Sequence, residues 1–227
     1  MLYITGDTHG TFSRLSSKNF PEGKDLTSND YILILGDFGL LWNNPPSKEE
    51  LWWKSWLDEK PWTTLFIDGN HENFLLLNRL PTTTMFDNKV GVYSDNIFHL
   101  KRGMVYNLCN KKVFTFGGAT SIDKHLCKPF KSWWPEEEPS YIEVINAAKE
   151  LDSENNKVDI ILTHDLPVSL ASKLCGYNID STPSNVFLDF VYNTVKFEKW
   201  YAGHFHKDVA IDNIVVLYYN ITKVEGT

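Results

Sequence analysis

Acidic, amide and imidazole side chains stand directly after short apolar runs at five places in this sequence. Five of the seven histidines belong to these sets. A single Asp or His at such a place is usually a turn residue or a satisfied polar group, whereas five sets in succession indicate a shared site. Their members are Asp7 and His9; Asp37; Asn70, His71 and Glu72; His164; and His204 and His206.

These residue types are suited to binding metal ions. Carboxylate and amide oxygens together with imidazole nitrogens suit Mn²⁺, Fe or Zn²⁺ better than Ca²⁺ or a metal that prefers thiolates. The spacings Asp-x-His and His-x-His place both members of each pair on one side of an extended segment. A set of this size exceeds the needs of one ion. It fits two ions about 3.5–4 Å apart that share a carboxylate and activate a water.

The apolar runs that precede these residues predict strands. Short runs that are apolar throughout are typical of strands buried on both faces, and therefore of a sheet that helices cover. Ligand sites on such α/β sheets lie beyond the carboxyl ends of the strands, which is where the polar residues stand. The predicted strands span residues 2–5, 31–35, 64–67, 113–116, 159–162 and 200–202.

Two helices are marked by capping boxes. Ser47 and Glu50 begin the first, which Pro61 blocks, and Ser140 and Glu143 begin the second. In each pair the hydroxyl and the carboxylate satisfy backbone N–H groups that the first helical turn leaves unpaired, and proline cannot continue a helix. Weaker helical patterns cover residues 73–79 and 187–195.

Antiparallel pairs are predicted in two further places. Residues 209–211 and 214–219 fit a hairpin around a two-residue turn, and residues 96–100, 104–108 and 112–116 are predicted to form a meander. The stretch 118–139 carries little regular signal, and an irregular segment of this length is typically functional. No linker divides the chain, so we predict one domain over residues 1–227.

Composition narrows the classes of function. The net charge is −7 and the only arginines are Arg14, Arg79 and Arg102, whereas a protein that binds extended nucleic acid usually carries a basic stripe. Three cysteines without paired spacing argue against disulfides and thiolate zinc sites. The N-terminus lacks the pattern of a signal peptide and no apolar run is long enough to span a membrane. We therefore expect a cytoplasmic protein without membrane contact.

From Asp7 to His206, nearly the whole chain, the five sets resemble the signature of the calcineurin-like metallophosphoesterase superfamily. The resemblance implies an α/β fold, a four-layer α/β/β/α sandwich of two mixed β-sheets flanked by helices. It also implies a dinuclear centre of divalent ions, Mn²⁺ foremost, with Fe, Zn²⁺ or Ni²⁺ as alternatives. By motif position, one ion binds Asp7, His9, Asp37 and His206, and the other binds Asp37, Asn70, His164 and His204, with Asp37 bridging.

The activity that this resemblance implies is hydrolysis of a phosphate ester. A metal-bridging hydroxide attacks phosphorus in line, and His71 matches the family's general acid, which protonates the leaving alkoxide. The expected substrate is a phosphomonoester or phosphodiester, either a small molecule or a nucleotide. Two alternatives stay open: a nuclease for short or single-stranded nucleic acid, and a protein-binding scaffold with the same fold.

The sequence departs from the protein phosphatases of this superfamily just after Asp37. Those enzymes carry a second Asp, which orients the acid histidine, and an Arg, which clamps the phosphate bidentately. Leu40 and Leu41 stand at these two positions. The difference argues against a phosphoprotein phosphatase and favours a phosphodiesterase or a small-molecule phosphatase.

Replacement contacts to the substrate are predicted at Arg102 and Lys124. Arg102 lies in a predicted turn, and Lys124 lies in the irregular stretch 118–139. Together with Trp133 and Trp134, this stretch would form part of the substrate wall. The alternative is a solvated basic loop whose tryptophans pack over the edge of the core.

Overall fold

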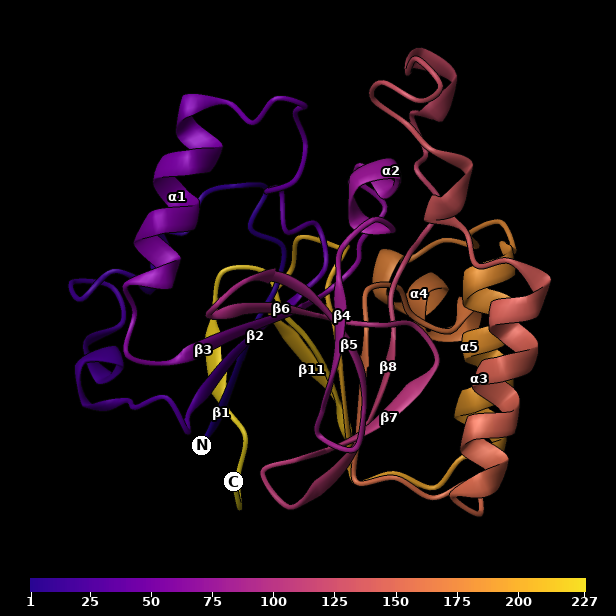
Figure 1. Cartoon of the computed structure of the whole chain (residues 1–227). Coiled ribbons are helices and arrows are strands. Elements are labelled where there is room, and N and C mark those ends of the chain that lie inside the picture. The colour runs from indigo at the N-terminus through magenta and orange to yellow at the C-terminus, as the bar shows by residue number, and fades with distance from the viewer.

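Two β-sheets packed face to face form the centre of the protein, as a computed structural model that describes all 227 residues shows (Figure 1). The first sheet contains, in spatial order, β13 (Ile221–Lys223), β1 (Leu2–Thr5), β2 (Tyr31–Leu35), β3 (Thr63–Ile67), β6 (Ile97–Leu100), β5 (Asn88–Ser94) and β4 (Thr82–Met85). The second contains β11 (Val209–Ile211), β12 (Ile214–Val216), β10 (Lys199–Ala202), β9 (Ile160–Thr163), β8 (Lys111–Phe116) and β7 (Met104–Leu108).

Helices cover the outer face of each sheet. On one side of the molecule lies α1 (Lys48–Asp58), and on the other lie α3 (Tyr141–Ser153), α4 (Val168–Cys175) and α5 (Pro183–Thr194) (Figure 1). The short α2 (Phe74–Leu77) lies at the upper end of the sheets, and 3-10 turns complete the regular structure at Ser13–Leu15, Pro21–Asp25, Lys124–Leu126 and Pro135–Glu137. The predicted four-layer α/β/β/α sandwich is therefore confirmed.

Three apolar cores hold the four layers together. The middle core joins the two sheets and includes Leu33 and Leu162, both fully buried. A second core lies between the second sheet and α3 to α5, and a third packs the first sheet against α1 and the N-terminal turns. Both faces of each sheet are thereby buried, which explains why the central strands are apolar at every position rather than alternating.

Capping boxes start the helices as the sequence predicts. The Ser47 hydroxyl accepts a hydrogen bond from the Glu50 N–H at the start of α1, and the Glu50 carboxylate accepts one from the Ser47 N–H. Ser140 and Glu143 do the same at α3. The helix α4 was not predicted from the sequence. None of the helices combines the length and the hydropathy that crossing a bilayer requires.

Parallel pairing brings the functional strand ends to one edge. β1, β2 and β3 run parallel in the first sheet, and β8, β9 and β10 run parallel in the second. The antiparallel hairpins β11–β12 and β7–β8 form as predicted. Since the parallel strands point the same way, the loops that follow them meet above the sheets.

The predicted meander over residues 96–116 is wrong. β6 pairs with β3 and β5 in the first sheet, whereas β7 pairs with β8 in the second. Between them the chain crosses from one sheet to the other at residues 101–103, where Gly103 has a positive φ of 70°. Because β3 and β5 occupy both edges of β6, no edge is left for β7. The strands β4 and β5 were not predicted, since β4 is a largely exposed run of threonines without an apolar pattern.

Candidate metal centre

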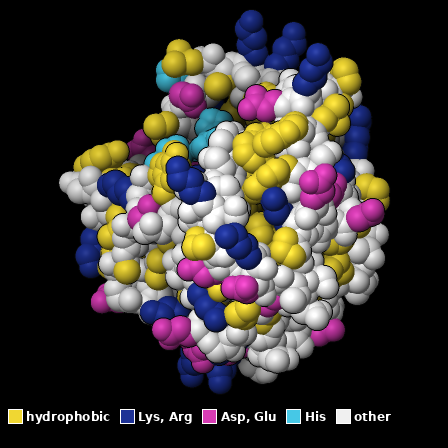
Figure 2. Space-filling view, turned by 90° about the vertical axis from the view of Figure 1, so that its left-hand side faces the viewer, with side chains coloured by type: hydrophobic (Ala, Val, Ile, Leu, Met, Phe, Trp, Pro, Cys, Tyr) yellow, Lys and Arg dark blue, Asp and Glu magenta, His cyan; other side chains and the backbone are white.

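The polar residues that follow the parallel strands meet above the sheets. Figure 2 shows histidine side chains gathered in a hollow near the top of the molecule. Their carboxylate and imidazole atoms lie within a few ångströms of one another in two overlapping groups, both of which contain Asp7. The residues brought together are Asp7, His9, Asp37, Asn70, His71, His164, His204 and His206.

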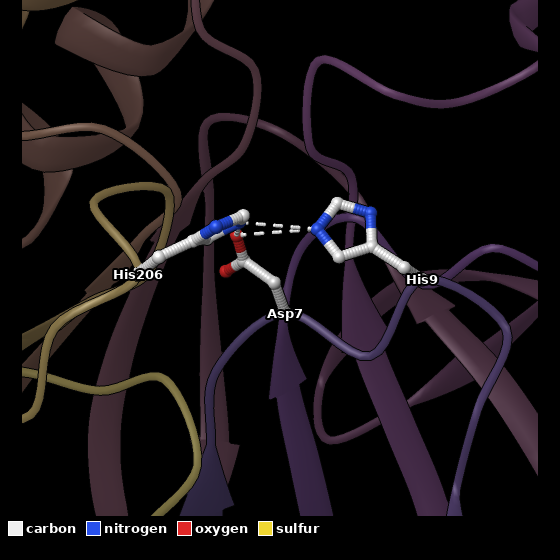
Figure 3. A group of neighbouring side chains, drawn as sticks. All are labelled: Asp7, His9 and His206. Carbon is white, nitrogen blue, oxygen red and sulfur yellow. Dashed lines mark hydrogen bonds and ion pairs between the residues drawn. The ribbon is translucent and has the colours of Figure 1, made fainter.

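The first group consists of Asp7, His9 and His206. The two imidazoles point toward each other from opposite sides, above the Asp7 carboxylate at the end of β1 (Figure 3). Their Nε2 atoms lie 3.1 Å apart, and the His206 Nε2 lies 3.1 Å from Asp7 Oδ2. His9 Nε2 lies 3.9 Å from Asp7 Oδ2 and 3.8 Å from Asp37 Oδ2. Asp37 therefore borders this group as well.

The second group surrounds the buried imidazole of His164. Its Nδ1 donates a hydrogen bond to the Leu35 carbonyl at 2.6 Å, which leaves Nε2 as the nitrogen that faces the site. That Nε2 atom lies 3.0 Å from Asn70 Oδ1 and 3.5 Å from Asp37 Oδ1. The ring of His204 lies beside it, with 5.0 Å between ring centroids.

Four of these residues have backbone conformations that are unusual for side chains with a Cβ atom. The φ angles are 45° at His9, 47° at Asp37, 67° at His204 and 48° at His206. A residue in a sparsely populated region of this kind destabilises the fold by ~1–3 kcal/mol, and such residues cluster at functional sites. Each of these loops therefore turns sharply after its strand and directs a polar side chain back toward the strand ends.

Two glycines leave room for the ligands. A Cβ on Gly69 would lie 2.1 Å from Asp37 Oδ1, and one on Gly36 would lie 2.3 Å from His164 Nδ1. Gly36 also has a positive φ of 92°, which side chains rarely adopt. A side chain at either glycine would therefore collide with a proposed metal ligand, which explains the Gly-Asp and Gly-Asn pairs in the sequence.

Asp7 stays ionised despite its burial. Burial alone would raise the pKa of Asp7, but the charge of nearby His164, the adjacent His206 and the backbone N–H of His204 lower it to about 2. The N–H of His204 donates to Asp7 Oδ1 at 2.9 Å. The other oxygen, Oδ2, is buried and lies 3.1 Å from His206 Nε2, but it accepts no well-aligned hydrogen bond.

The imidazoles differ in their protonation. Burial lowers the pKa of His204 to about 4, and burial also lowers the pKa of His9. For His164, burial acts in the same direction, but the carboxylates of Asp37 and Asp7 outweigh it and raise the pKa. The adjacent carboxylate of Asp7 raises the pKa of His206. His204 is thus neutral at pH 7, the form in which an imidazole binds metal.

This arrangement fits divalent metal ions. An ionised, buried carboxylate oxygen without a hydrogen bond is costly unless a cation is near it. The Nε2 atoms of His9 and His206 face this oxygen and each other, so three potential ligand atoms converge on one region. The mixture of carboxylate, amide and imidazole donors is the set that Mn²⁺, Fe and Zn²⁺ accept.

Partners that the sequence pattern does not reveal hold two of the proposed ligands. The Asn70 amide nitrogen donates to the Ser121 hydroxyl at 3.0 Å, and Ser121 is bonded in turn to the fully buried carboxylate of Glu137. The ring of Tyr218 stacks on His206, with 4.3 Å between centroids and an interplanar angle of 17°. Ser121 and Glu137 lie in the irregular stretch 118–139, whose length is the only sequence signal for them.

The side chain of Glu72 links the loops that follow β2 and β3. Its Oε1 atom accepts hydrogen bonds from the Phe38 N–H at 2.8 Å and the Gly69 N–H at 3.4 Å. Its side chain is buried. Glu72 thus joins the loop that carries Asp37 to the loop that carries Asn70.

Arg102 does not face these residues, contrary to the prediction that it contacts the substrate. Its Nε donates to the buried carboxylate of Asp68 at 2.6 Å, and its Nη2 donates to the carbonyls of Glu136 and Glu137. Its side chain is only 6% exposed. With its donors engaged at Asp68 and the turn 135–137, the guanidinium ties this turn to the end of β3.

Lys124 lies on the surface of the stretch 118–139, which projects above the sheets in Figure 1. Trp134 is fully buried in the third core, 5.3 Å from the ring of Trp42, so it does not line a substrate wall. The alternative prediction, tryptophans packed over the core edge, holds for Trp134.

A cleft of about 390 Å³ opens beside the imidazoles of His9 and His71. The backbone N–H of His71 donates to Asp37 Oδ1 at 2.8 Å, and no hydrogen bond engages its ring. Leu40, one of the two leucines at the phosphatase-specific positions, lines this cleft and leaves no Asp to orient His71 there.

Comparison with known proteins agrees with this geometry. A family model described as calcineurin-like phosphoesterase matches residues 2–208. A solved structure of a "Putative 5'-Nucleotidase" from Staphylococcus aureus in complex with alpha-ketoglutarate has a TM-score of 0.51 and 15% identity, and the match covers 96% of this chain. It covers 48% of that chain, so this protein spans about half its length. No curated protein matches the sequence.

Proposed function

This chain belongs to the calcineurin-like phosphoesterase family, and we propose that it hydrolyses a phosphate ester of a small molecule or nucleotide at two divalent metal ions. One observation carries the proposal. The imidazole Nε2 atoms of His9 and His206 converge on a buried, ionised oxygen of Asp7 that accepts no well-aligned hydrogen bond, and His9 lines a cleft together with His71.

The ligand set that we propose is the one that the family motif implies, and the two groups of side chains support it. Asp7, His9, Asp37 and His206 would hold one ion, and Asp37, Asn70, His164 and His204 would hold the other. Asp37 is the shared ligand because its Oδ2 faces His9 at 3.8 Å while its Oδ1 faces His164 at 3.5 Å. Mn²⁺ is the foremost candidate, and Fe, Zn²⁺ and Ni²⁺ are alternatives, since this donor set does not discriminate strongly among them.

Bound metal ions supply Lewis acidity to phosphoryl oxygens and a nucleophile from water at neutral pH. The chain itself provides the proton for the leaving group. His71 lines the cleft, and its ring lies 5.9 Å, centroid to centroid, from that of His9. Its backbone N–H is tied to Asp37, so the imidazole is held beside the shared ligand and can protonate a departing alkoxide.

The walls of the cleft favour small esters. Neither Lys nor Arg lines it, and its volume of about 390 Å³ is that of a pocket for a small molecule. A nuclease for extended strands would need cationic side chains that track a phosphate backbone. The three cysteines form no disulfide, which is compatible with the cytoplasmic setting that we propose.

Hydrolysis of model esters tests the proposal. The protein loaded with Mn²⁺ is assayed with p-nitrophenyl phosphate and bis-p-nitrophenyl phosphate, which separate monoesterase from diesterase activity. Asp37→Asn is expected to abolish hydrolysis of both. His71→Gln is expected to lower the rate by ~10²–10⁴-fold for phenyl phosphate, whose phenoxide is a poor leaving group. The loss should be smaller for p-nitrophenyl phosphate, because p-nitrophenoxide departs without a proton.

A matched control is His125→Gln, which removes an exposed imidazole in the stretch 118–139 and should leave both rates unchanged. Absence of hydrolysis of either ester by the wild-type protein with Mn²⁺, Fe²⁺, Zn²⁺ or Ni²⁺ would overturn the proposal.

A further inference from the structure

The cleft beside His71 has an unusual charge for a site that handles phosphate esters. Its walls come from the loop after β2 and from the first turn of α1. Two carboxylates, Glu49 and Glu50, line it, and no Lys or Arg does. Since His71 stands at the same cleft, this is where the leaving group of a substrate would lie.

Glu50 shapes the wall but does not offer a free charge. Its Oε1 atom accepts from the N–H groups of Trp42 at 2.7 Å and Asn43 at 2.9 Å. Its Oε2 atom accepts from the Asn43 side chain at 2.7 Å and the Ser47 N–H at 2.8 Å. Burial alone would raise the pKa of Glu50, but these donors lower it. Four donors thus surround an ionised carboxylate that fixes the loop.

Glu49 is different. Its side chain is exposed and has neither a hydrogen bond nor an ion pair in the structure, although it lines the same cleft. Its negative charge is therefore available to whatever occupies the cleft. At roughly 7 Å, a carboxylate disfavours a second anion by a factor on the order of 3 to 50, for effective dielectric constants between that of water and about 20.

The other lining groups suit an uncharged polar molecule. Trp42 and Leu40 supply apolar surface, and Asn43 and Ser47 supply polar atoms. The side-chain carbonyl oxygen of Asn43 accepts no hydrogen bond. The Ser47 hydroxyl accepts from the Glu50 backbone N–H, and its own proton is free. A ring with hydroxyl or amine groups would find both an apolar face and hydrogen-bond partners here.

We propose that this cleft holds the leaving group of the substrate and that Glu49 selects neutral or cationic leaving groups over anionic ones. The inference rests on the proposed function, because it assigns the leaving-group side of that same site. The substrate class is then a phosphate ester of an uncharged alcohol, such as a nucleoside monophosphate. Nucleoside diphosphates and pyrophosphate, whose leaving groups are anions, are selected against.

Two aryl esters that differ by one charge test the proposal. Phenyl phosphate and 4-carboxyphenyl phosphate have leaving groups of similar shape, and the ratio of their kcat/KM values is measured with the Mn²⁺-loaded protein. The wild-type protein is expected to prefer phenyl phosphate. Glu49→Gln should lower this ratio ~3- to 50-fold, and Glu49→Lys should reverse the preference. Glu59→Gln, which removes an exposed charge near the other end of α1, is the matched control and should leave the ratio unchanged.

Binding separates this inference from the proposed function. Phenylphosphonate and 4-carboxyphenylphosphonate cannot be hydrolysed, and calorimetry gives the ratio of their Kd values. The selectivity is supported if the wild-type protein binds the carboxylated compound more weakly and Glu49→Gln removes this difference. This holds even if no ester is hydrolysed, because absence of hydrolysis would refute only the phosphoesterase activity. Equal ratios in the wild-type, Glu49→Gln and Glu59→Gln proteins, in both rates and binding, would overturn the inference.

Discussion

The side-chain amide of Asn70 donates a hydrogen bond to the hydroxyl of Ser121, with 3.0 Å between nitrogen and oxygen. This bond orients the amide, because the opposite atom, Asn70 Oδ1, is then turned toward His164 Nε2. Ser121 is held by Glu137, whose side chain is fully buried. The irregular stretch 118–139 therefore supports one of the proposed metal ligands from behind.

Ser121→Ala is expected to weaken metal binding at the Asn70 side of the centre. The alanine leaves the Asn70 amide and one oxygen of Glu137 without a partner, so the amide is free to rotate. Loss of such an outer partner lowers metal affinity by ~10–100-fold. Titration with Mn²⁺ should show one weakened site and one unchanged site. Ser132→Ala, in the same stretch but partly exposed and remote from Asn70 in its hydrogen bonding, should change neither, and equal affinities in all three proteins would contradict this role.

Tyr218 is expected to position His206. Its ring stacks on the imidazole, while its carbonyl accepts from Arg14 and its N–H donates to Asp208 at 2.8 Å. Tyr218→Leu removes the flat surface and should weaken Mn²⁺ binding at the site of His9 and His206 by ~10-fold. Tyr218→Phe keeps the ring and, since no hydrogen bond engages the hydroxyl, should bind as the wild type does. An equal loss in both variants would show that stacking is not the cause.

Arg102→Met is expected to destabilise the fold without changing substrate binding. The substitution leaves the Asp68 carboxylate buried without its main counter-charge, which lowers the free energy of unfolding by ~3–5 kcal/mol. Urea unfolding measures this loss. Arg79→Met, at an exposed arginine, should change it by no more than about 0.5 kcal/mol. A raised KM with unchanged stability would instead indicate that Arg102 contacts the substrate.

Asp68 should make stability depend on acidic pH. Burial alone would raise the pKa of Asp68, but Arg102 and His99 hold it well below its ordinary value. An unfolded Asp titrates near pH ~3.9, so the stabilisation is fully present above that pH and is lost as the pH falls toward the folded pKa.

The stability difference between the wild-type and Asp68→Asn proteins should therefore be largest near neutral pH and shrink steadily below about pH 4. Urea unfolding at a series of pH values measures it. The exposed Asp95→Asn variant serves as the control. A difference that stays constant from neutral to acidic pH would contradict the depressed pKa.

The sequence predicted most of what is local. Asp7, Asp37 and His164 could be placed because each follows an apolar strand, and parallel strands bring their carboxyl ends together. The partners that orient them could not be placed. Ser121 is 51 residues from Asn70, and the bond between them exists only once the stretch 118–139 lies against the loop that follows β3. Arg102 was assigned to the substrate because a lone arginine in a turn gives no sign of a buried carboxylate beneath it.

The fold shows the same division. The apolar runs at residues 2–5 and 31–35 indicate buried strands, and both strands form as predicted. The run at residues 97–100 is compatible with either sheet. Its place between β3 and β5 is decided by pairing with strands that are distant in the sequence. Periodicity identifies a strand, but it does not identify the neighbour with which the strand pairs.

Metal content is the most direct test of the dinuclear centre. The protein is equilibrated with excess Mn²⁺, desalted and analysed by inductively coupled plasma mass spectrometry, beside Asp37→Asn and the His125→Gln control. The account predicts about two ions per chain for the wild-type and control proteins, as a centre with a shared carboxylate requires. It predicts fewer than one for Asp37→Asn, because both ions lose a ligand. Fewer than one tightly bound ion per wild-type chain would contradict it.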